Sequence, residues 1–146
     1  MLEITNTTKQ KINKKQAIAL ANYVLRFYKK EGKEVSLVVI GDKKMHSLNY
    51  QFRGVDKTTD VLSFSGDKNN PDFLGEIFIN IQEAGRTAKY IEMFSTKKSA
   101  TYIFNFLLVH GLLHLLGYDD KTEKERQVMI ILGDKFLNGF FQKKVL

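Results

Sequence analysis

Two of the three histidines in the chain, His110 and His114, lie four residues apart in a segment with a helical pattern of apolar residues. Four residues advance an α-helix by about 400° and about 6 Å, so both imidazoles leave the same face and can bind one ion. Gly117 and Asp120 follow in the sequence HGLLHLLGYDD. If Gly117 ends the helix in a left-handed conformation, the chain turns back and Asp120 can reach that ion. Two imidazoles and one carboxylate form an open site that suits zinc.

The spacing resembles the metzincin zinc-peptidase pattern H-E-x-x-H-x-x-G-x-x-H. Gly111 stands where that pattern has its catalytic Glu, and Asp120 stands where it has its third His. A plainer interpretation makes His110 and His114 hydrogen-bonded core residues on a leucine-rich helix, with Asp120 in an ordinary turn. The third histidine, His46, has no partner at ligand spacing and is expected on the surface of its helix.

Composition points to one soluble globular domain that spans residues 1–146, with 43% hydrophobic and 27% charged residues. The sequence contains no cysteine, which excludes disulfides, Cys-ligated zinc and thiol catalysis. The net charge of +7 favours a polyanionic partner such as nucleic acid. No window approaches the roughly 20 apolar residues of a membrane span, and the first residues lack the apolar stretch of a secretory signal. We therefore expect a cytoplasmic protein with no membrane partner.

Hydrophobic periodicity predicts an α+β domain, with a small mixed sheet of about four strands packed against about five helices. The expected strands cover residues 2–6, 35–40, 61–64 and 76–81. The expected helices cover residues 14–30, 43–53, 82–93, 95–116 and 122–137. Asn13 and Ser95 are the expected helix N-caps, and Gly32, Gly117 and Gly139 are the expected helix ends. The continuously aliphatic strand at 35–40 is expected to be buried on both faces. In this arrangement the histidine-bearing helix lies in the core.

The histidine motif, the upstream segment LNYQFRGVDKTTDVLSF and the intervening LGEIFIN together resemble the YbeY family of endoribonucleases, the rRNA maturation RNases. In that family an Asn and an Arg four residues apart precede a TDVLSF strand, and Asn49 and Arg53 match this pair. A later HGxLHLxGYDH motif supplies three zinc ligands in the family, and His110 and His114 match the first two. The resemblance runs from residue 48 to residue 134, and it implies a zincin-like fold with the metal-binding helix in the core.

The largest departure from the family pattern is Asp120, which replaces the third histidine. The carboxylate keeps a ligand but adds a negative charge and a harder donor, so iron or manganese could bind as readily as zinc. Thr58 replaces a common proline, and Glu76 replaces the Asp of LGDI; we interpret both as structural drift.

The resemblance implies a single-strand-specific metallo-endoribonuclease with one Zn²⁺ per chain. It further implies 3′-end maturation of 16S rRNA and ribosome quality control, with single-stranded rRNA and the small ribosomal subunit as partners. We hypothesise that Arg53 is the catalytic residue that binds the scissile phosphate, because a guanidinium matches phosphate oxygens in a bidentate fork. Asn49 shares its helix face and could support Arg53 or touch the RNA. The cations Arg86, Lys89, Lys97 and Lys98 could form an RNA-binding face.

Three other functions remain open from the residues alone. A zinc-dependent peptidase or amidohydrolase is favoured by the metzincin-like spacing and opposed by Gly111, which cannot take a proton from a bound water. A non-haem iron oxygenase is favoured by the two histidines and one carboxylate, although such triads usually lie on β-strands. A non-enzymatic ribosome-assembly module would make no catalytic use of a metal.

Overall fold

The computed structural model describes residues 1–145, and within them the chain forms the expected α+β fold with four strands and six α-helices. The strands are β1 (Leu2–Asn6), β2 (Glu34–Ile40), β3 (Val61–Ser65) and β4 (Phe73–Asn80). The helices are α1 (Lys14–Phe27), α2 (Asp42–Arg53), α3 (Ile81–Ala84), α4 (Ile91–Phe94), α5 (Ala100–Leu115) and α6 (Glu123–Val145), with a 3₁₀ turn at Thr87–Tyr90.

The four strands form one mixed sheet in the order β1-β2-β4-β3. β1, β2 and β4 are parallel, and β3 runs antiparallel to β4 at the edge of the sheet. Ile77 of β4 faces Leu37 on one side and Ser63 on the other. β3 and β4 are joined by a polar loop at residues 66–72.

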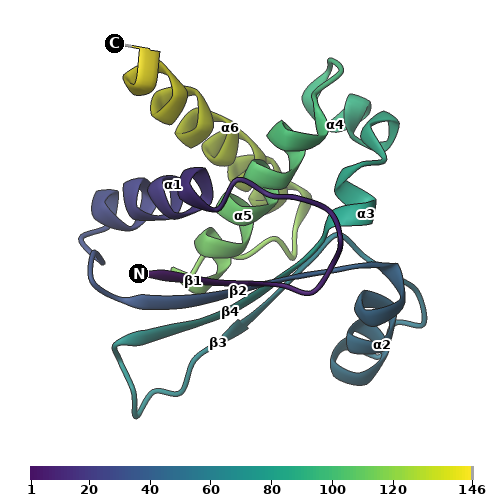
Figure 1. The fold of residues 1–146 in the computed structure, drawn as a ribbon, viewed down its shortest axis with the longest axis horizontal. Coiled ribbons are helices and arrows are strands. Elements are labelled where there is room, and N and C mark those ends of the chain that lie inside the picture. Colours follow the sequence, from purple (N-terminus) through teal and green to yellow (C-terminus); the bar gives the residue numbers. More distant parts are fainter. Residues whose placement is uncertain (146) are drawn as a thin grey trace.

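Helices α1 and α5 cover one face of the sheet, α6 packs against both of these helices, and α2 lies against one end of the opposite face (Figure 1). Helix α5 occupies the centre of the first layer because it is apolar on nearly every side, as a helix enclosed by neighbours must be. Leu108 and Leu112 are fully buried between the sheet and the flanking helices. The prediction of a core metal-binding helix is thereby confirmed as far as the position of this helix is concerned.

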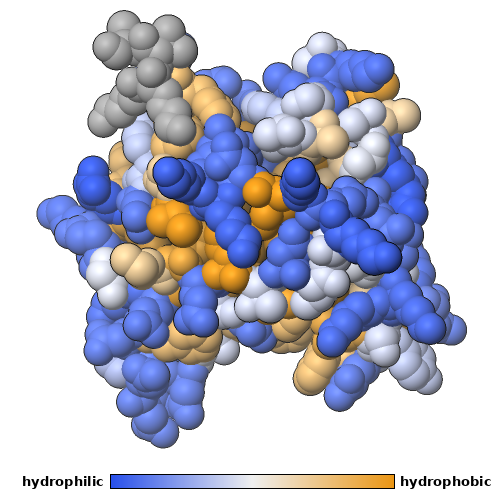
Figure 2. Space-filling model, viewed as in Figure 1, coloured by the Kyte–Doolittle hydropathy of each residue, from blue (hydrophilic) through white to orange (hydrophobic). Residues whose placement is uncertain are grey.

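The outer face of the sheet is less covered than the sequence suggested. Residues 35–40 were expected to be buried on both faces, but Ser36 and Val38 stay partly exposed. The reason is that α2 covers only the end of β2 where Ile40 lies, packing through Met45 (Figure 1). Within residues 1–145, no other helix lies over this face. Figure 2 shows the molecule in the same view, with hydrophilic side chains over most of the surface and hydrophobic side chains near the middle.

Several helix boundaries differ from the predictions for local physical reasons. Helix α1 starts after the predicted cap Asn13, but it ends at Phe27, because Lys29 already takes the left-handed conformation with φ 57°. The predicted end, Gly32, also has a positive φ, 86°, but it lies in the turn that follows the helix. The predicted helix at 82–93 is broken into α3, the 3₁₀ turn and α4. Helix α5 begins after Ser99, whose hydroxyl accepts from Tyr102 N, whereas Ser95 ends α4.

Two further elements are longer than predicted. Strand β4 begins at Phe73, ahead of the expected residue 76. Helix α6 continues past Gly139 to Val145, so this glycine does not end the helix. It instead lets α1 approach α6 closely. A Cβ at Gly139 would lie 2.7 Å from the hydroxyl oxygen of Tyr23 on α1. No helix within residues 1–145 is both long enough and apolar enough to cross a membrane.

Asn80, fully buried at the end of β4, holds the loop that leads into β3. Its amide nitrogen lies 2.8 Å from Asp42 Oδ1, 3.0 Å from Thr58 Oγ1 and 3.1 Å from Thr59 O. Hydrogen bonds from Arg86, and then from Asn80, lower the pKa of Asp42 to about 2, so this carboxylate is charged at neutral pH. Thr58, interpreted above as drift, thus takes part in fixing the residues that precede β3.

Candidate metal centre

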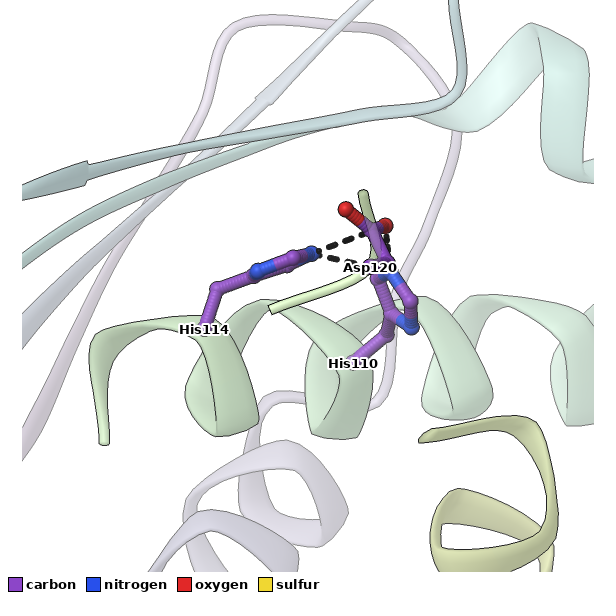
Figure 3. A group of neighbouring side chains, drawn as sticks. All are labelled: His110, His114 and Asp120. Atoms are coloured by element: carbon purple, nitrogen blue, oxygen red, sulfur yellow. Dashed lines mark hydrogen bonds and ion pairs between the residues drawn. The ribbon is translucent and has the colours of Figure 1, made fainter. Parts of the chain in front are cut away.

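His110 and His114 project from one face of α5, and Asp120 approaches them from the loop that follows (Figure 3). The loop turns back at Gly117, whose φ is +106°. Its amide donates to His114 O at 3.0 Å, and the amide of Tyr118 donates to Leu113 O at 3.0 Å, which is the hydrogen-bond pattern of a glycine-terminated helix. The predicted left-handed glycine and the predicted meeting of the three side chains are both present in the structure.

The three candidate ligand atoms converge on one point. His110 Nε2 and His114 Nε2 are 3.1 Å apart, and Asp120 Oδ2 lies 3.2 Å from His114 Nε2 and 3.4 Å from His110 Nε2. Zinc with bond lengths near 2.0–2.1 Å separates tetrahedral ligands by about 3.3–3.4 Å. The three atoms therefore form a triangle that matches one face of a zinc coordination tetrahedron.

Hydrogen bonding around His114 favours the ligand form of its ring. Nδ1 lies 3.1 Å from the backbone oxygen of Tyr118, so this nitrogen carries the proton and Nε2 presents its lone pair to the centre. A backbone carbonyl behind a ligating histidine is a common means of fixing the ring orientation. Since Asp120 Oδ2 is also an acceptor, the centre brings together atoms that need a cation or protons between them.

His110 is the more buried of the two imidazoles, with a side chain only 13% exposed. Burial, and then the neighbouring His114, lower its pKa below the ordinary value, so the ring is neutral at pH 7. Its outer nitrogen, Nδ1, is enclosed and has no hydrogen-bond partner among the described residues, while the ring stacks against Phe106 at 5.9 Å. The other nitrogen, Nε2, lies on the side of Asp120. A neutral ring that presents the lone pair of Nε2 there is the form that binds a metal.

The centre opens into a cleft of about 550 Å³. Residues from four parts of the chain line it: the end of α2, the segment 59–65 that contains β3, the second half of α5, and the loop after α5. They include Arg53, Asp60, Ser63, Asp119 and Lys121 as well as the three candidate ligands. Because the three candidate ligands line this cleft, a metal held by them would be open to a substrate, which is the condition for a catalytic and not merely structural metal.

Arg53, the proposed phosphate-binding residue, is the last residue of α2 and reaches the same cleft. Its Nη2 donates to the carbonyl of Ser63 at 3.0 Å, and its guanidinium carbon lies 4.8 Å from the centre of the Phe64 ring. Asn49 behaves differently from the prediction: it is buried, and its amide donates to Lys57 O at 2.8 Å. Asn49 therefore holds the turn after α2. Among the described residues it does not line the cleft, and its side chain has no hydrogen bond to Arg53.

The predicted basic face is only partly available for RNA. Arg86 donates to Asp42 and to Glu83 Oε1, and Lys89 lies 3.3 Å from the same Glu83 oxygen, so nearby carboxylates offset both charges. Lys98 lies over the ring of Tyr102 at 4.5 Å. The cleft has a cation that sequence reasoning missed, Lys121, whose Nζ is 3.6 Å from Asp119 Oδ2. His46 is exposed as predicted and lies 2.7 Å from Asp56 Oδ1.

Asp60 is a second cleft residue that the sequence did not single out. One of its oxygens accepts from the hydroxyl of Tyr90 at 2.9 Å. Burial, and then the charge of Asp60, raise the pKa of Tyr90, which keeps the hydroxyl protonated as a donor. In the sequence, Asp60 could be noticed as the acidic residue directly before the strand of the TDVLSF segment. Its place in a cleft could not be predicted, because that depends on β3 lying beside α5.

Comparison with known proteins gives the family of the chain. The family model described as Endoribonuclease YbeY matches residues 3–140. The chain belongs to the YbeY family. An Endoribonuclease YbeY of Acholeplasma laidlawii is 38% identical over 75% of this chain and 76% of its own length. One of Ligilactobacillus salivarius is 33% identical over 88% of this chain and 91% of its own length. A solution structure of a Thermotoga maritima protein shares the fold, with a TM-score of 0.61, 24% identity and coverage of 98% and 91% of the two chains.

In this YbeY family member, Gly111 lies where α5 touches the sheet. A Cβ at this position would lie 2.7 Å from Ile77 Cγ2 and 3.1 Å from Ser63 Oγ. The hydroxyl of Ser63 also contacts Gly111 O at 3.3 Å. A glutamate at position 111 would have to displace Ile77 or Ser63, and the glycine present has no side chain that could take a proton from a bound water. The geometry thus argues against the peptidase alternative.

Replacing Gly111 by alanine is expected to lower the free energy of unfolding by about 1–2 kcal/mol, because overpacking at Ile77 outweighs the better helix propensity of alanine. Thermal or urea denaturation of the metal-free protein measures this change. Gly85→Ala is the matched control, since its φ is −73° and the nearest atom to an added Cβ is 3.4 Å away. Equal stability of the two variants would show that α5 can move off the sheet without cost.

Proposed function

We propose that this YbeY family member is a metal-dependent endoribonuclease that hydrolyses phosphodiester bonds of single-stranded rRNA. The observation that carries the proposal is the position of Arg53 in the same cleft as His110, His114 and Asp120. One part of the cleft offers ligands for a cation, and another offers a guanidinium for a phosphate. Metal-assisted hydrolysis of a phosphodiester can use both kinds of group, the cation for the attacking water and the guanidinium for the charge on the phosphate.

His110, His114 and Asp120 would hold one Zn²⁺, or another divalent ion, through Nε2, Nε2 and a carboxylate oxygen. When bound, such an ion supplies a water of lowered pKa and polarises a phosphoryl oxygen. Arg53 binds the phosphate and stabilises its developing charge through the N–H groups not directed at Ser63 O. The carbonyl of Tyr118 keeps the His114 proton on Nδ1, so the ring stays in its ligand form. Lys121 adds positive charge at the rim of the cleft.

The biological role proposed here is 3′-end maturation of 16S rRNA and ribosome quality control in the cytoplasm, with the small ribosomal subunit as partner. Support comes from the family: its relatives in several bacteria carry the name endoribonuclease. The net charge of +7 is suited to an RNA partner. A ribosome-assembly module without catalysis is the competing role, and it predicts binding that does not depend on the metal.

The test begins with protein purified without chelators, whose metal content is measured by elemental mass spectrometry. We expect about one metal ion per chain, as for a three-ligand catalytic site. A single-stranded oligonucleotide spanning the 3′ end of precursor 16S rRNA should be cleaved, and the same oligonucleotide annealed to its complement should not. Chelation should abolish cleavage, and separate additions of Zn²⁺, Mn²⁺ and Fe²⁺ should identify the ion that restores it. Undiminished cleavage by metal-free protein would contradict the proposal.

A further inference from the structure

A row of aromatic side chains lies on the open face of the sheet, beside the cleft. Phe64 alternates along β3 with Ser63, which contacts α5, so Phe64 faces the opposite side of the sheet. There its ring lies 5.3 Å from that of Phe52 on α2 and 5.8 Å from that of Phe78 on β4. Phe64 and Phe78 are partly exposed, and Phe52 is 53% exposed. We call Phe52, Phe64 and Phe78 the aromatic strip.

The strip begins where the cleft ends. Arg53, which lines the cleft, places its guanidinium carbon 4.8 Å from the centre of the Phe64 ring. The centre of the Phe52 ring therefore lies within about 10 Å of that guanidinium carbon, a distance that a single nucleotide spans. A strand whose phosphate binds Arg53 thus carries its neighbouring base toward Phe52.

Charge on this face determines which part of a nucleotide can lie over it. Glu76 is the register partner of Phe64, and its carboxylate accepts from Ser36 Oγ at 3.1 Å on the same outer face. A negative side chain there repels phosphates, which are attracted to Arg53 at the edge of the sheet. The arrangement favours a backbone along the cleft and uncharged bases over the strip.

We propose that the exposed ring of Phe52, supported by Phe64, is a stacking site for an unpaired base of the nucleotide next to the phosphate on Arg53. This inference rests on the proposed function and deepens it, because it gives a physical origin for single-strand specificity. Every base has a π face, so stacking tolerates any sequence, but a base within a duplex is already stacked and paired. Exposure alone does not make a ring part of this site. Phe27 is 69% exposed, but it belongs to a different cluster, with Tyr28 and Phe136 on the α1 side.

Phe52→Leu is the informative variant, because leucine retains an apolar side chain against Phe64 and lacks the flat ring. We measure kcat and KM of the metal-loaded full-length protein on a single-stranded oligonucleotide, and its affinity by fluorescence anisotropy. Stacking is worth about 1–3 kcal/mol per base, so we expect Kd and KM to rise about tenfold with kcat within about twofold of wild type. Phe52→Trp should retain wild-type affinity, and Phe27→Leu is the matched control and should change nothing.

A second measurement separates stacking from packing. An abasic nucleotide placed next to the cleavage site should weaken binding to the wild type about tenfold and should have no further effect on Phe52→Leu. If Phe52→Leu binds as tightly as Phe27→Leu while the wild type cleaves the RNA, the stacking site is refuted and the proposed function stands. If the wild type neither binds nor cleaves single-stranded RNA, the proposed function fails and the stacking site fails with it.

Discussion

Simultaneous replacement of His110 and His114 by alanine is expected to remove the metal and to reduce RNA cleavage by about a thousandfold or more. Two of the three candidate ligands disappear, and Asp120 alone cannot hold an ion that normally needs three protein donors. Loss of the ion forfeits several kcal/mol of transition-state stabilisation, and each 1.36 kcal/mol is a factor of ten in rate. Elemental mass spectrometry and cleavage of single-stranded RNA, on the same protein samples, measure both effects.

His46→Ala is the matched control, because His46 is exposed and lies on α2 away from the cleft. It should retain the metal and the activity. The wild type should also gain thermal stability when the metal is added, and the double variant should not, since only the native fold assembles the centre. Full metal occupancy in the double variant would show that the ion binds elsewhere, and retained cleavage would separate the reaction from this centre.

Two features of the centre differ in whether the sequence could predict them. The convergence of His110, His114 and Asp120 follows from helix periodicity and one glycine, all within eleven residues, so local rules were sufficient to predict it. The Tyr118 carbonyl behind His114 was not predictable, because it depends on how the turn after Gly117 closes. The start of α5 was predicted wrongly for the same kind of reason: Ser95 and Ser99 are both acceptable N-caps, and the packing of the chain selects Ser99.

The location of Arg53 illustrates the larger limit of sequence reasoning. Nothing local relates the end of α2 to α5, which lies on the other side of the sheet (Figure 1). They meet at the cleft because β3 is the edge strand, so a side chain from α2 can reach around it to Ser63 O. Only the strand order, with β4 placed between β2 and β3, brings these residues together. The role assigned to Arg53 came from family resemblance, and the structure supplies the position that makes this role testable.

Replacing Arg53 by alanine is therefore expected to reduce cleavage by about 100- to 1000-fold, the usual effect of removing one group that stabilises transition-state charge. Arg53 is exposed, and its side chain donates a single hydrogen bond among the described residues, to Ser63 O, so metal content and melting temperature should stay near those of the wild type. Arg53→Lys should recover only part of the activity, because an ammonium keeps the charge but not the bidentate geometry.

Arg26→Ala is the matched control for lost positive charge, since Arg26 is an exposed arginine near the end of α1, outside the cleft. If binding to Arg53 is a phosphate contact, Arg53→Ala should also make RNA affinity less dependent on salt, by roughly one counterion, whatever the base sequence. A large loss of cleavage with an unchanged salt dependence would place Arg53 in the support of β3 and not at the phosphate. Arg53→Lys distinguishes these roles, because lysine can restore the salt dependence without restoring the geometry that the reaction requires.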